Sequence, residues 1–241
     1  MHKSLTSSVL YVTVGAAAVL AMNASLALSA DQGSIARGAK LYDKWFKVIK
    51  AEKPKDTHSA WPASNTKKKG NTTWRCKSCH GWDYKGKDGA YAKGSYKTGI
   101  KGINAMAGAS TAKIIAVMND DTHKLSGKMG DADYMDLAMF VSKGQIDMSK
   151  YIDSATKAVK NGDAARGQDY FETMCTQCHG KNGDKPDDMK KTLAKQMSNP
   201  WEVMHKILNG QPGEQMPGLR TLDPQITIDI MSHLATLPKA K

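Results

Sequence analysis

The sequence predicts an all-α protein made of two helical domains in tandem. A Cys-x-x-Cys-His pattern occurs at residues 76–80 and again at residues 175–179. Each copy is followed by a segment whose apolar residues have the spacing of a helix, at 134–141 and at 226–234. The repetition of motif and helix indicates one architecture used twice along the chain.

The two motifs contain every cysteine of the chain: Cys76, Cys79, Cys175 and Cys178. Two thiols at this spacing can form thioether bonds to the two vinyl groups of one haem, and the next histidine binds the iron on its proximal side. The sequence therefore predicts two covalently bound haem c groups, with His80 and His179 as the proximal iron ligands.

Other uses of these cysteines fit the pattern less well. Paired zinc knuckles usually lie about 12 to 20 residues apart, whereas the first cysteines of the two motifs are 99 residues apart (175 − 76). A thioredoxin-type dithiol needs one pair and no following histidine. Disulfides within the motifs would be strained and would leave the histidines unexplained.

Residues 1–30 have the pattern of a secretory signal peptide. A basic start precedes an apolar run over residues 9–22, and small residues follow the run. The run is short for a membrane span, so we expect cleavage between residues 28 and 31, with an uncleaved anchor as the alternative. No later segment of the sequence is long and apolar enough to span a bilayer. Export to the periplasm fits both haem attachment and the absence of spare cysteines.

Three matching blocks define the internal repeat. Residues 36–42 match residues 165–171 at an offset of 129, and the motifs match at an offset of 99. The final helices, residues 129–141 and 222–234, match at an offset of 93. The first copy therefore gains 30 residues (129 − 99) before its motif, and we expect this insertion, near residues 48–74, to form a long loop.

The blocks also set the expected domain boundaries: a signal peptide at 1–30, an N-terminal domain at 31–145, a linker at 146–162 and a C-terminal domain at 163–241. A short helix over residues 148–159 is expected within the linker. Helix starts before the two final helices are expected at Asp131 and at Asp223-Pro224.

The order of helix, haem motif, ligand loop and helix resembles that of class I cytochrome c, and the resemblance covers both repeats. It implies two tandem class I domains, each with a few helices around a covalently attached haem. In that family the first and last helices cross with a glycine of one against an aromatic residue of the other, which implies a contact of Gly38 with Phe140. The matching pair in the second repeat is Gly167 with His233, where histidine stands in place of the usual aromatic residue.

The sixth ligand of the second iron is assigned through the same resemblance. Residues 210–218 form a glycine-rich segment with a Met-Pro pair, similar to the distal loop of class I cytochromes. The resemblance implies that Met216 binds the second iron. A thioether ligand favours Fe(II) and raises the reduction potential.

In the first repeat, two residues compete for the same role. Met129 directly precedes the last helix, but the offset of 93 places it over Leu222, a core position, and places Met216 over His123. We therefore favour His123 as the sixth ligand, which gives bis-histidine ligation, and keep Met129 as the alternative. Further alternatives are Met106, His58 and no second protein ligand.

Two six-coordinate irons leave no open position for a substrate, so we expect an electron carrier rather than an enzyme. The expected function is that of a periplasmic dihaem cytochrome that passes single electrons between redox partner proteins. One alternative is a haem enzyme of the peroxidase or dehydrogenase type with a labile distal site in the first domain. Another is a cytochrome subunit of a larger oxidoreductase complex.

The net charge is concentrated in the first half of the chain. Residues 31–150 carry 22 Lys and Arg against 12 Asp and Glu, which gives +10, whereas residues 151–241 carry 12 against 11. A basic first domain favours an acidic electron donor that docks there, or contact with anionic lipid headgroups. Nucleic acid is a poor partner for an exported protein, and a solvated lysine-rich face without a specific partner is the alternative.

Overall fold

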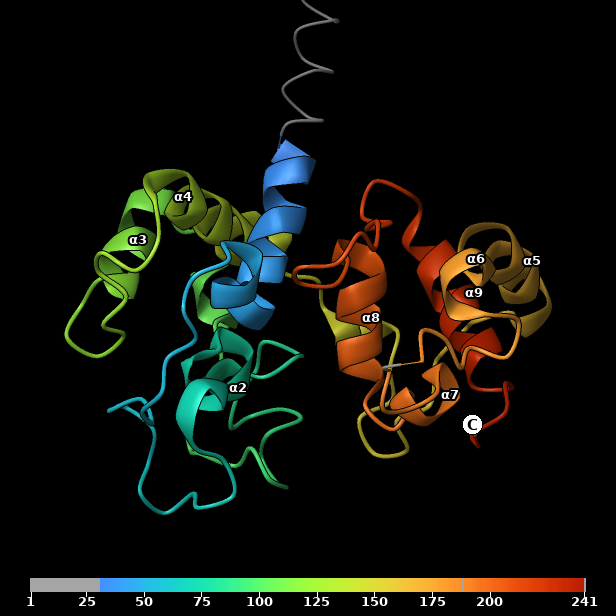
Figure 1. Cartoon of the computed structure of the whole chain (residues 1–241), viewed down its shortest axis with the longest axis horizontal. Coiled ribbons are helices and arrows are strands. Elements are labelled where there is room, and N and C mark those ends of the chain that lie inside the picture. Colours follow the sequence, from blue (N-terminus) through green and yellow to red (C-terminus); the bar gives the residue numbers. More distant parts are fainter. Residues whose placement is uncertain (1–30, 188, 241) are drawn as a thin grey trace, which may run out of the picture.

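The computed structural model describes residues 31–187 and 189–240, and the chain over these ranges is helical (Figure 1). The predicted signal peptide lies outside the described residues. Within the described ranges, extended pairing is limited to two isolated bridges, Gly86 with Lys101 and Ile152 with Val159. The all-α fold class is confirmed. No helix in these ranges has the length and apolar character needed to cross a membrane.

The first half contains a helix over residues 31–48, a 3-10 helix η1 (Gly70–Trp74), α2 (Cys76–His80), a 3-10 helix η2 (Asn104–Met106), α3 (Thr111–Met118), α4 (Asp131–Met139) and a π-helical turn η3 (Phe140–Gly144). The second half contains a 3-10 helix η4 (Met148–Lys150), α5 (Ala164–Met174), α6 (Thr176–His179), α7 (Leu193–Gln196), α8 (Pro200–Asn209) and α9 (Pro224–Leu234). The insertion before the first motif is irregular except for η1, as expected.

The N-terminal helix crosses α4 in close contact at Gly38. A Cβ atom on Gly38 would lie 1.9 Å from the carbonyl oxygen of Asp136 and 2.8 Å from the Cβ of Phe140. Only a residue without a side chain allows two backbones to approach so closely. The Arg37 guanidinium fastens the crossing through ion pairs with Asp133 and Asp136. The predicted contact of Gly38 with Phe140 is confirmed.

The second half repeats this crossing between α5 and α9. A Cβ atom on Gly167 would lie 1.9 Å from the carbonyl oxygen of Asp229 and 3.0 Å from the Cβ of His233. The guanidinium Nε of Arg166 lies 2.9 Å from the Asp229 carboxylate, in the position that Arg37 holds in the first half. The ring of His233 packs against that of Phe171 with centroids 5.3 Å apart, so the histidine takes the place of the aromatic residue.

The predicted starts of the final helices agree with the structure. α9 begins at Pro224, and the side chain of Asp223 accepts a hydrogen bond from the backbone N–H of Gln225. α4 begins at Asp131, with Gly130 as its capping residue.

The predicted linker helix over residues 148–159 is wrong beyond its first turn. Only Met148–Lys150 is helical, and of the 3-10 type. The Asp153 carboxylate accepts hydrogen bonds from the backbone N–H groups of Ala155 and Thr156, at 3.0 and 2.7 Å. Aspartate that binds its own following backbone in this way favours a turn over a helix.

Substitution Gly38→Ala should lower the free energy of unfolding by about 1–3 kcal/mol, because the added methyl group overlaps the backbone of α4. Gly33→Ala is the matched control in the same helix: it is exposed, has nothing within 4 Å of the added atom, and gains up to about 1 kcal/mol of helix propensity. Chemical denaturation of the two variants measures both effects. Equal stability of the two variants would contradict the close crossing.

Candidate functional site

The first motif forms the single helical turn α2, which ends at Gly81. Gly81 has φ +86°, a conformation that favours glycine, and its N–H donates to the carbonyl of Lys77 at 3.1 Å. Cys76 and His80 are four residues apart in this turn, so their side chains leave the same side of the helix. The turn therefore presents the first thiol and the imidazole together.

A cavity of about 180 Å³ adjoins the motif and is lined by both of its cysteines. It brings Cys76, Cys79 and His80 together with His123, a residue more than forty positions further along the chain. The predicted proximal ligand and the favoured sixth ligand thus share one cavity with the two thiols.

The imidazole rings of His80 and His123 lie close together in the lining of this cavity. Their centroids are 6.1 Å apart, with ring planes inclined by 23°. A metal held between two imidazole nitrogens at about 2.0 Å from each, with ring centres about 1 Å behind each nitrogen, needs a centroid separation of about 6 Å. The two rings therefore fit a shared axial metal.

Hydrogen bonds fix which nitrogen each ring presents. His80 Nδ1 lies 2.7 Å from the carbonyl oxygen of Lys101, and because a carbonyl only accepts, Nδ1 carries the proton. His123 Nδ1 lies 2.9 Å from the carboxylate of Asp120. With each Nδ1 engaged, it is the Nε2 atom of each ring that could hold a metal, as is typical of histidine ligands. Desolvation lowers the pKa of His80 to about 4, so its imidazole is neutral at pH 7.

The electrostatics of the thiols do not resemble those of a reactive dithiol. Desolvation raises the pKa of Cys76 and of Cys79 to about 12, whereas reactive cysteines have a lowered pKa. None of the four cysteines forms a disulfide. Their environment is suited to an apolar group covalently attached at this place.

Met129, the alternative sixth ligand, lies in the hydrophobic core and is 8% exposed. The described side chains that line the cavity include His123 but not Met129.

The insertion contributes a wall to this cavity, of which the sequence singled out only His58, as an alternative sixth ligand. His58, Ala60, Thr73 and Trp74 all line it. His58 lies against the loop of His123, with its Nε2 atom 2.9 Å from the His123 carbonyl oxygen. No local pattern marks this contact, since the two residues are 65 positions apart.

The second motif repeats the proximal arrangement of the first. His179 Nδ1 lies 3.1 Å from the carbonyl oxygen of Lys185, as His80 does from Lys101. Desolvation also raises the pKa of Cys175, to about 11. Met216 is half-buried in the loop after α8. Among the described contacts, Met216 is not paired with His179 in the way that His123 is paired with His80.

Gly210 shapes the Met216 loop. Its φ is +86°, and a Cβ atom there would lie 2.4 Å from the carbonyl oxygen of Met216. The ammonium of Lys47, from the N-terminal helix, binds the Glu214 carboxylate of the same loop at 2.5 Å. The loop therefore folds back so that Gly210 lies against Met216, and the Lys47–Glu214 ion pair connects it to the first half of the chain.

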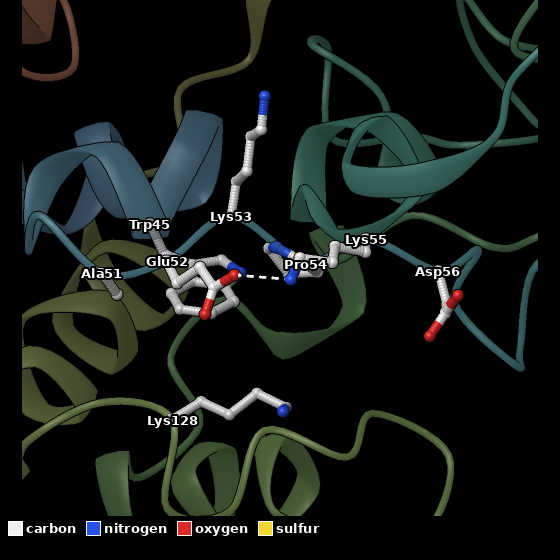
Figure 2. A pocket seen from close by; sticks show the side chains of 8 residues that line it. All are labelled: Trp45, Ala51, Glu52, Lys53, Pro54, Lys55, Asp56 and Lys128. Atoms are coloured by element: carbon white, nitrogen blue, oxygen red, sulfur yellow. Dashed lines mark ion pairs between the residues drawn. The ribbon is translucent and has the colours of Figure 1, made fainter.

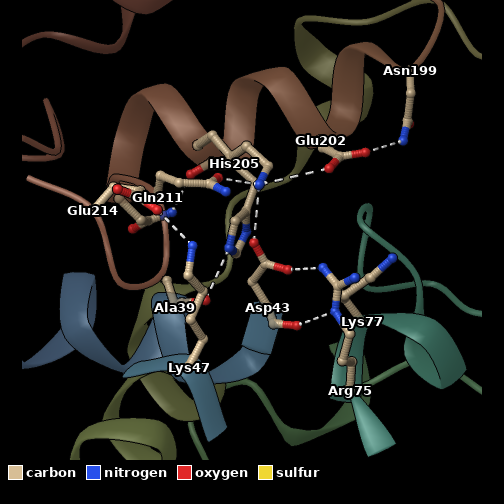
Figure 3. Close-up of polar contacts among 12 residues, drawn as sticks. Ala39, Asp43, Lys47, Arg75, Lys77, Asn199, Glu202, His205, Gln211 and Glu214 are labelled. Carbon is tan, nitrogen blue, oxygen red and sulfur yellow. Dashed lines mark hydrogen bonds and ion pairs between the residues drawn. The ribbon is translucent and has the colours of Figure 1, made fainter. Parts of the chain in front are cut away.

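Helix α8 of the second half packs directly against the first half through His205, which is 1% exposed (Figure 3). Its Nε2 atom lies 3.0 Å from the carbonyl oxygen of Ala39, so this nitrogen is the donor, and Nδ1 accepts from the Tyr84 hydroxyl at 3.0 Å. The ring also packs against Trp82 with centroids 5.0 Å apart. Burial lowers the pKa of His205 to about 4, which keeps the ring neutral.

Asp43 forms the charged part of the same contact and is 1% exposed. Its carboxylate binds the Arg75 guanidinium, directly before the first motif, and the Lys206 ammonium of α8 at 3.1 Å (Figure 3). Burial alone would raise the pKa of Asp43, but Lys206 and Arg75 outweigh it and hold the pKa well below its usual range. The carboxylate therefore stays ionised and joins the two halves next to the haem motif.

Comparison with known families finds a match in the second half of the chain. Residues 162–233 match the family model described as cytochrome C oxidase, cbb3-type, subunit III. A comparison with curated proteins gives no match. The match covers α5, the second motif, the Met216 loop and most of α9, so this part of the chain is similar to a cytochrome c domain. Such a domain implies covalently bound haem c and haem-based electron transfer.

Substitution Asp43→Asn should lower the free energy of unfolding by about 2–4 kcal/mol at pH 7, because it leaves the Arg75 and Lys206 cations without their carboxylate. The control Asp88→Asn changes a 70% exposed side chain and should have an effect within about 0.5 kcal/mol.

The effect of Asp43→Asn should also depend on pH. The folded pKa of Asp43 lies below its ordinary value of 3.8, so its stabilisation is complete above that value and is lost as the pH falls through the folded pKa. Urea titrations at several pH values should show a constant difference from the unsubstituted protein above about pH 5, and a shrinking difference below pH 3.8. A difference that grows toward acid pH would contradict the assignment.

Proposed function

We propose that this chain is a dihaem c-type cytochrome that transfers single electrons between redox partners in the periplasm. One haem c is attached through Cys76 and Cys79, and the other through Cys175 and Cys178. His80 and His123 bind the first iron. His179 and Met216 bind the second.

The observation that carries the proposal is the pairing of His80 with His123. Two imidazoles 6.1 Å apart, each with its Nδ1 atom already engaged, meet the axial requirements of one iron, and both motif thiols line the same cavity. An iron with two protein ligands has no open position for a substrate, which favours a carrier over a haem enzyme.

The proposed axial ligands differ between the two irons, and this difference sets the direction of electron flow. A thioether at the second iron favours Fe(II), whereas a second imidazole at the first iron favours Fe(III) more strongly. The Asp120 carboxylate on His123 Nδ1 makes that imidazole more basic and adds to the difference. Electrons therefore pass from the first haem to the second.

An acidic electron donor is proposed to dock at an open cleft beside the first haem cavity (Figure 2). The cleft has a volume of about 400 Å³, and its charged lining residues are the lysines Lys53, Lys55 and Lys128 and the carboxylates Glu52 and Asp56. Lys128 places its ammonium 5.0 Å from the ring centre of Trp74, and Trp74 also lines the haem cavity. A carboxylate-rich surface docked in this cleft would be separated from the haem cavity by one side chain, that of Trp74.

The proposed location rests on the class of the second half, since cytochrome c domains typically function outside the cytoplasm. It also rests on the signal-like pattern of residues 1–30. The basic first half can in addition touch an anionic membrane surface, and no nucleic acid partner is proposed.

Substitution His123→Ala should convert the first haem of the oxidised holoprotein from low spin to high spin, because it removes one axial nitrogen. Met129→Leu, a nearly isosteric change in the core, should leave both haems low-spin. Near-infrared magnetic circular dichroism distinguishes bis-histidine from His/Met ligation in each variant. The opposite pattern, with Met129→Leu opening the iron and His123→Ala silent, would assign the ligand to Met129.

Substitution Met216→His should lower the reduction potential of the second haem and remove most of the gap between the two haems. The control Met135→Leu alters a 45% exposed methionine of α4 and should leave both potentials unchanged. Spectroelectrochemical titration gives the two midpoints. A first haem that is already the higher of the two in the unsubstituted protein would sink the proposed direction of flow.

A further inference from the structure

His58 belongs to the insertion that the second half lacks, and both of its ring nitrogens are engaged. Nε2 donates to the carbonyl oxygen of His123 at 2.9 Å, because a carbonyl can only accept. Nδ1 accepts from the backbone N–H of Ala60 at 3.1 Å. This pattern requires the neutral ring, and burial lowers the pKa of His58 in agreement with it. In this arrangement His58 has no free nitrogen for the iron.

The insertion holds the His58 ring in a fixed orientation. Its backbone N–H donates to the Thr73 hydroxyl at 2.8 Å, and that hydroxyl donates to the carbonyl of Gly70 at 2.7 Å. The ring edge packs against Trp74 with centroids 4.3 Å apart and planes at 69°. His58 is 9% exposed, so few other positions are open to the ring.

The loop that carries His123 is held by its own residues around Asp120 and by the core at Leu125, whose carbonyl accepts from the Tyr134 hydroxyl. The Asp120 carboxylate accepts from the backbone N–H groups of Thr122 and His123 and from the His123 ring. Asp120 is 43% exposed, and Lys124 next to His123 has φ +51°. At His123 itself, the hydrogen bonds with Asp120 lie within the loop. The bond from His58 comes from outside the loop, on the wall of the same cavity.

We propose that His58 is a positioning residue that holds His123 against the first iron, so that the insertion acts as a clamp on the distal side of this haem. The inference rests on the proposed bis-histidine ligation and adds a role for the insertion. The clamp keeps the first iron six-coordinate and closed to external ligands. In this proposal the hydrogen bond from His58 to the His123 carbonyl keeps the iron six-coordinate. The packing of the rest of the insertion does not contribute.

The test compares three variants of the full-length holoprotein by cyanide binding to the oxidised first haem. His58→Leu removes the donor at similar volume, and His58→Gln restores an N–H₂ group that can reach the same carbonyl. Asn65→Ala is the matched control: Asn65 is another buried side chain of the insertion, and it bonds the carbonyls of Ser95 and Lys97 but not the His123 loop. Magnetic circular dichroism follows the bis-histidine signature separately from the His/Met signature.

His58→Leu should raise the apparent affinity of the first haem for cyanide about fivefold, the effect of one lost neutral hydrogen bond. His58→Gln should return it to within about twofold of the unsubstituted protein, and Asn65→Ala should leave it unchanged. An equal rise in cyanide affinity in His58→Leu and Asn65→Ala would overturn the clamp, since it would show a general effect of the insertion. No change with His58→Leu would overturn it as well.

The variant His123→Ala separates this inference from the proposed ligation. If His123→Ala opens the iron while His58→Leu does nothing, the ligation stands and the clamp fails. If His123→Ala leaves the bis-histidine signature intact, the ligation itself fails and the clamp with it.

Thr73→Val provides a second route if His58→Leu does not accumulate as holoprotein. It removes the hydroxyl that accepts from the His58 backbone and leaves the His58 side chain in place. The clamp requires a rise in cyanide affinity in the same direction. A fully folded Thr73→Val protein with unchanged affinity would count against the clamp.

Discussion

The close crossing of first and last helices is the constraint on which the rest of this structure depends. At Gly38 and at Gly167 a backbone carbonyl of the last helix occupies the space where a side chain would begin. Because the two ends of each half are fixed together, the chain between them must return on itself and enclose a space. The Cys-x-x-Cys-His turn follows the first helix directly in the second half and after the insertion in the first half. In the first half, the loop before the last helix brings His123 to the motif from the other side.

The two halves meet through a contact that neither could form alone. His205 and Lys206 are neighbours on α8. The neutral ring of His205 packs against Trp82 and accepts a hydrogen bond from Tyr84. The ammonium of Lys206 forms an ion pair with buried Asp43. Asp43 also binds Arg75, which directly precedes the first haem motif. Buried charge of this kind tolerates little change in geometry, because a displaced partner leaves an uncompensated ion. The contact therefore fixes the orientation of α8 relative to the first motif.

Features that depend on local pattern could be predicted from the sequence, and features that depend on distant pairing could not. The start of α9 follows from a capping aspartate and a proline, which are adjacent in the sequence. The helix crossings join distant residues and were predicted through the resemblance to class I cytochrome c. The placement of His123 came from the register between the repeats, which carries spatial information across the chain. His58 gave no such signal, since its partner is 65 positions away and its segment has no counterpart in the second half. No local pattern marks the role of His205, because its partners Ala39 and Tyr84 are 166 and 121 positions away. The linker helix failed for a local reason, the turn closed by Asp153, which competes with helical hydrogen bonds.

The two halves of the repeat differ in their candidate axial ligands, and this difference matters for the proposed electron transfer. Two identical haem domains would have equal potentials and no preferred direction for an electron. The insertion adds the wall with His58 to the first half, and its ligand loop has Asp120 beside His123, where the second half has a glycine-rich loop with Met216. A carboxylate on the far nitrogen of an imidazole ligand stabilises the oxidised iron, and a thioether stabilises the reduced iron. In the proposed dihaem carrier, the same changes that distinguish the two sequences would shift the two potentials in opposite directions, and the α8 contact would join the two sites.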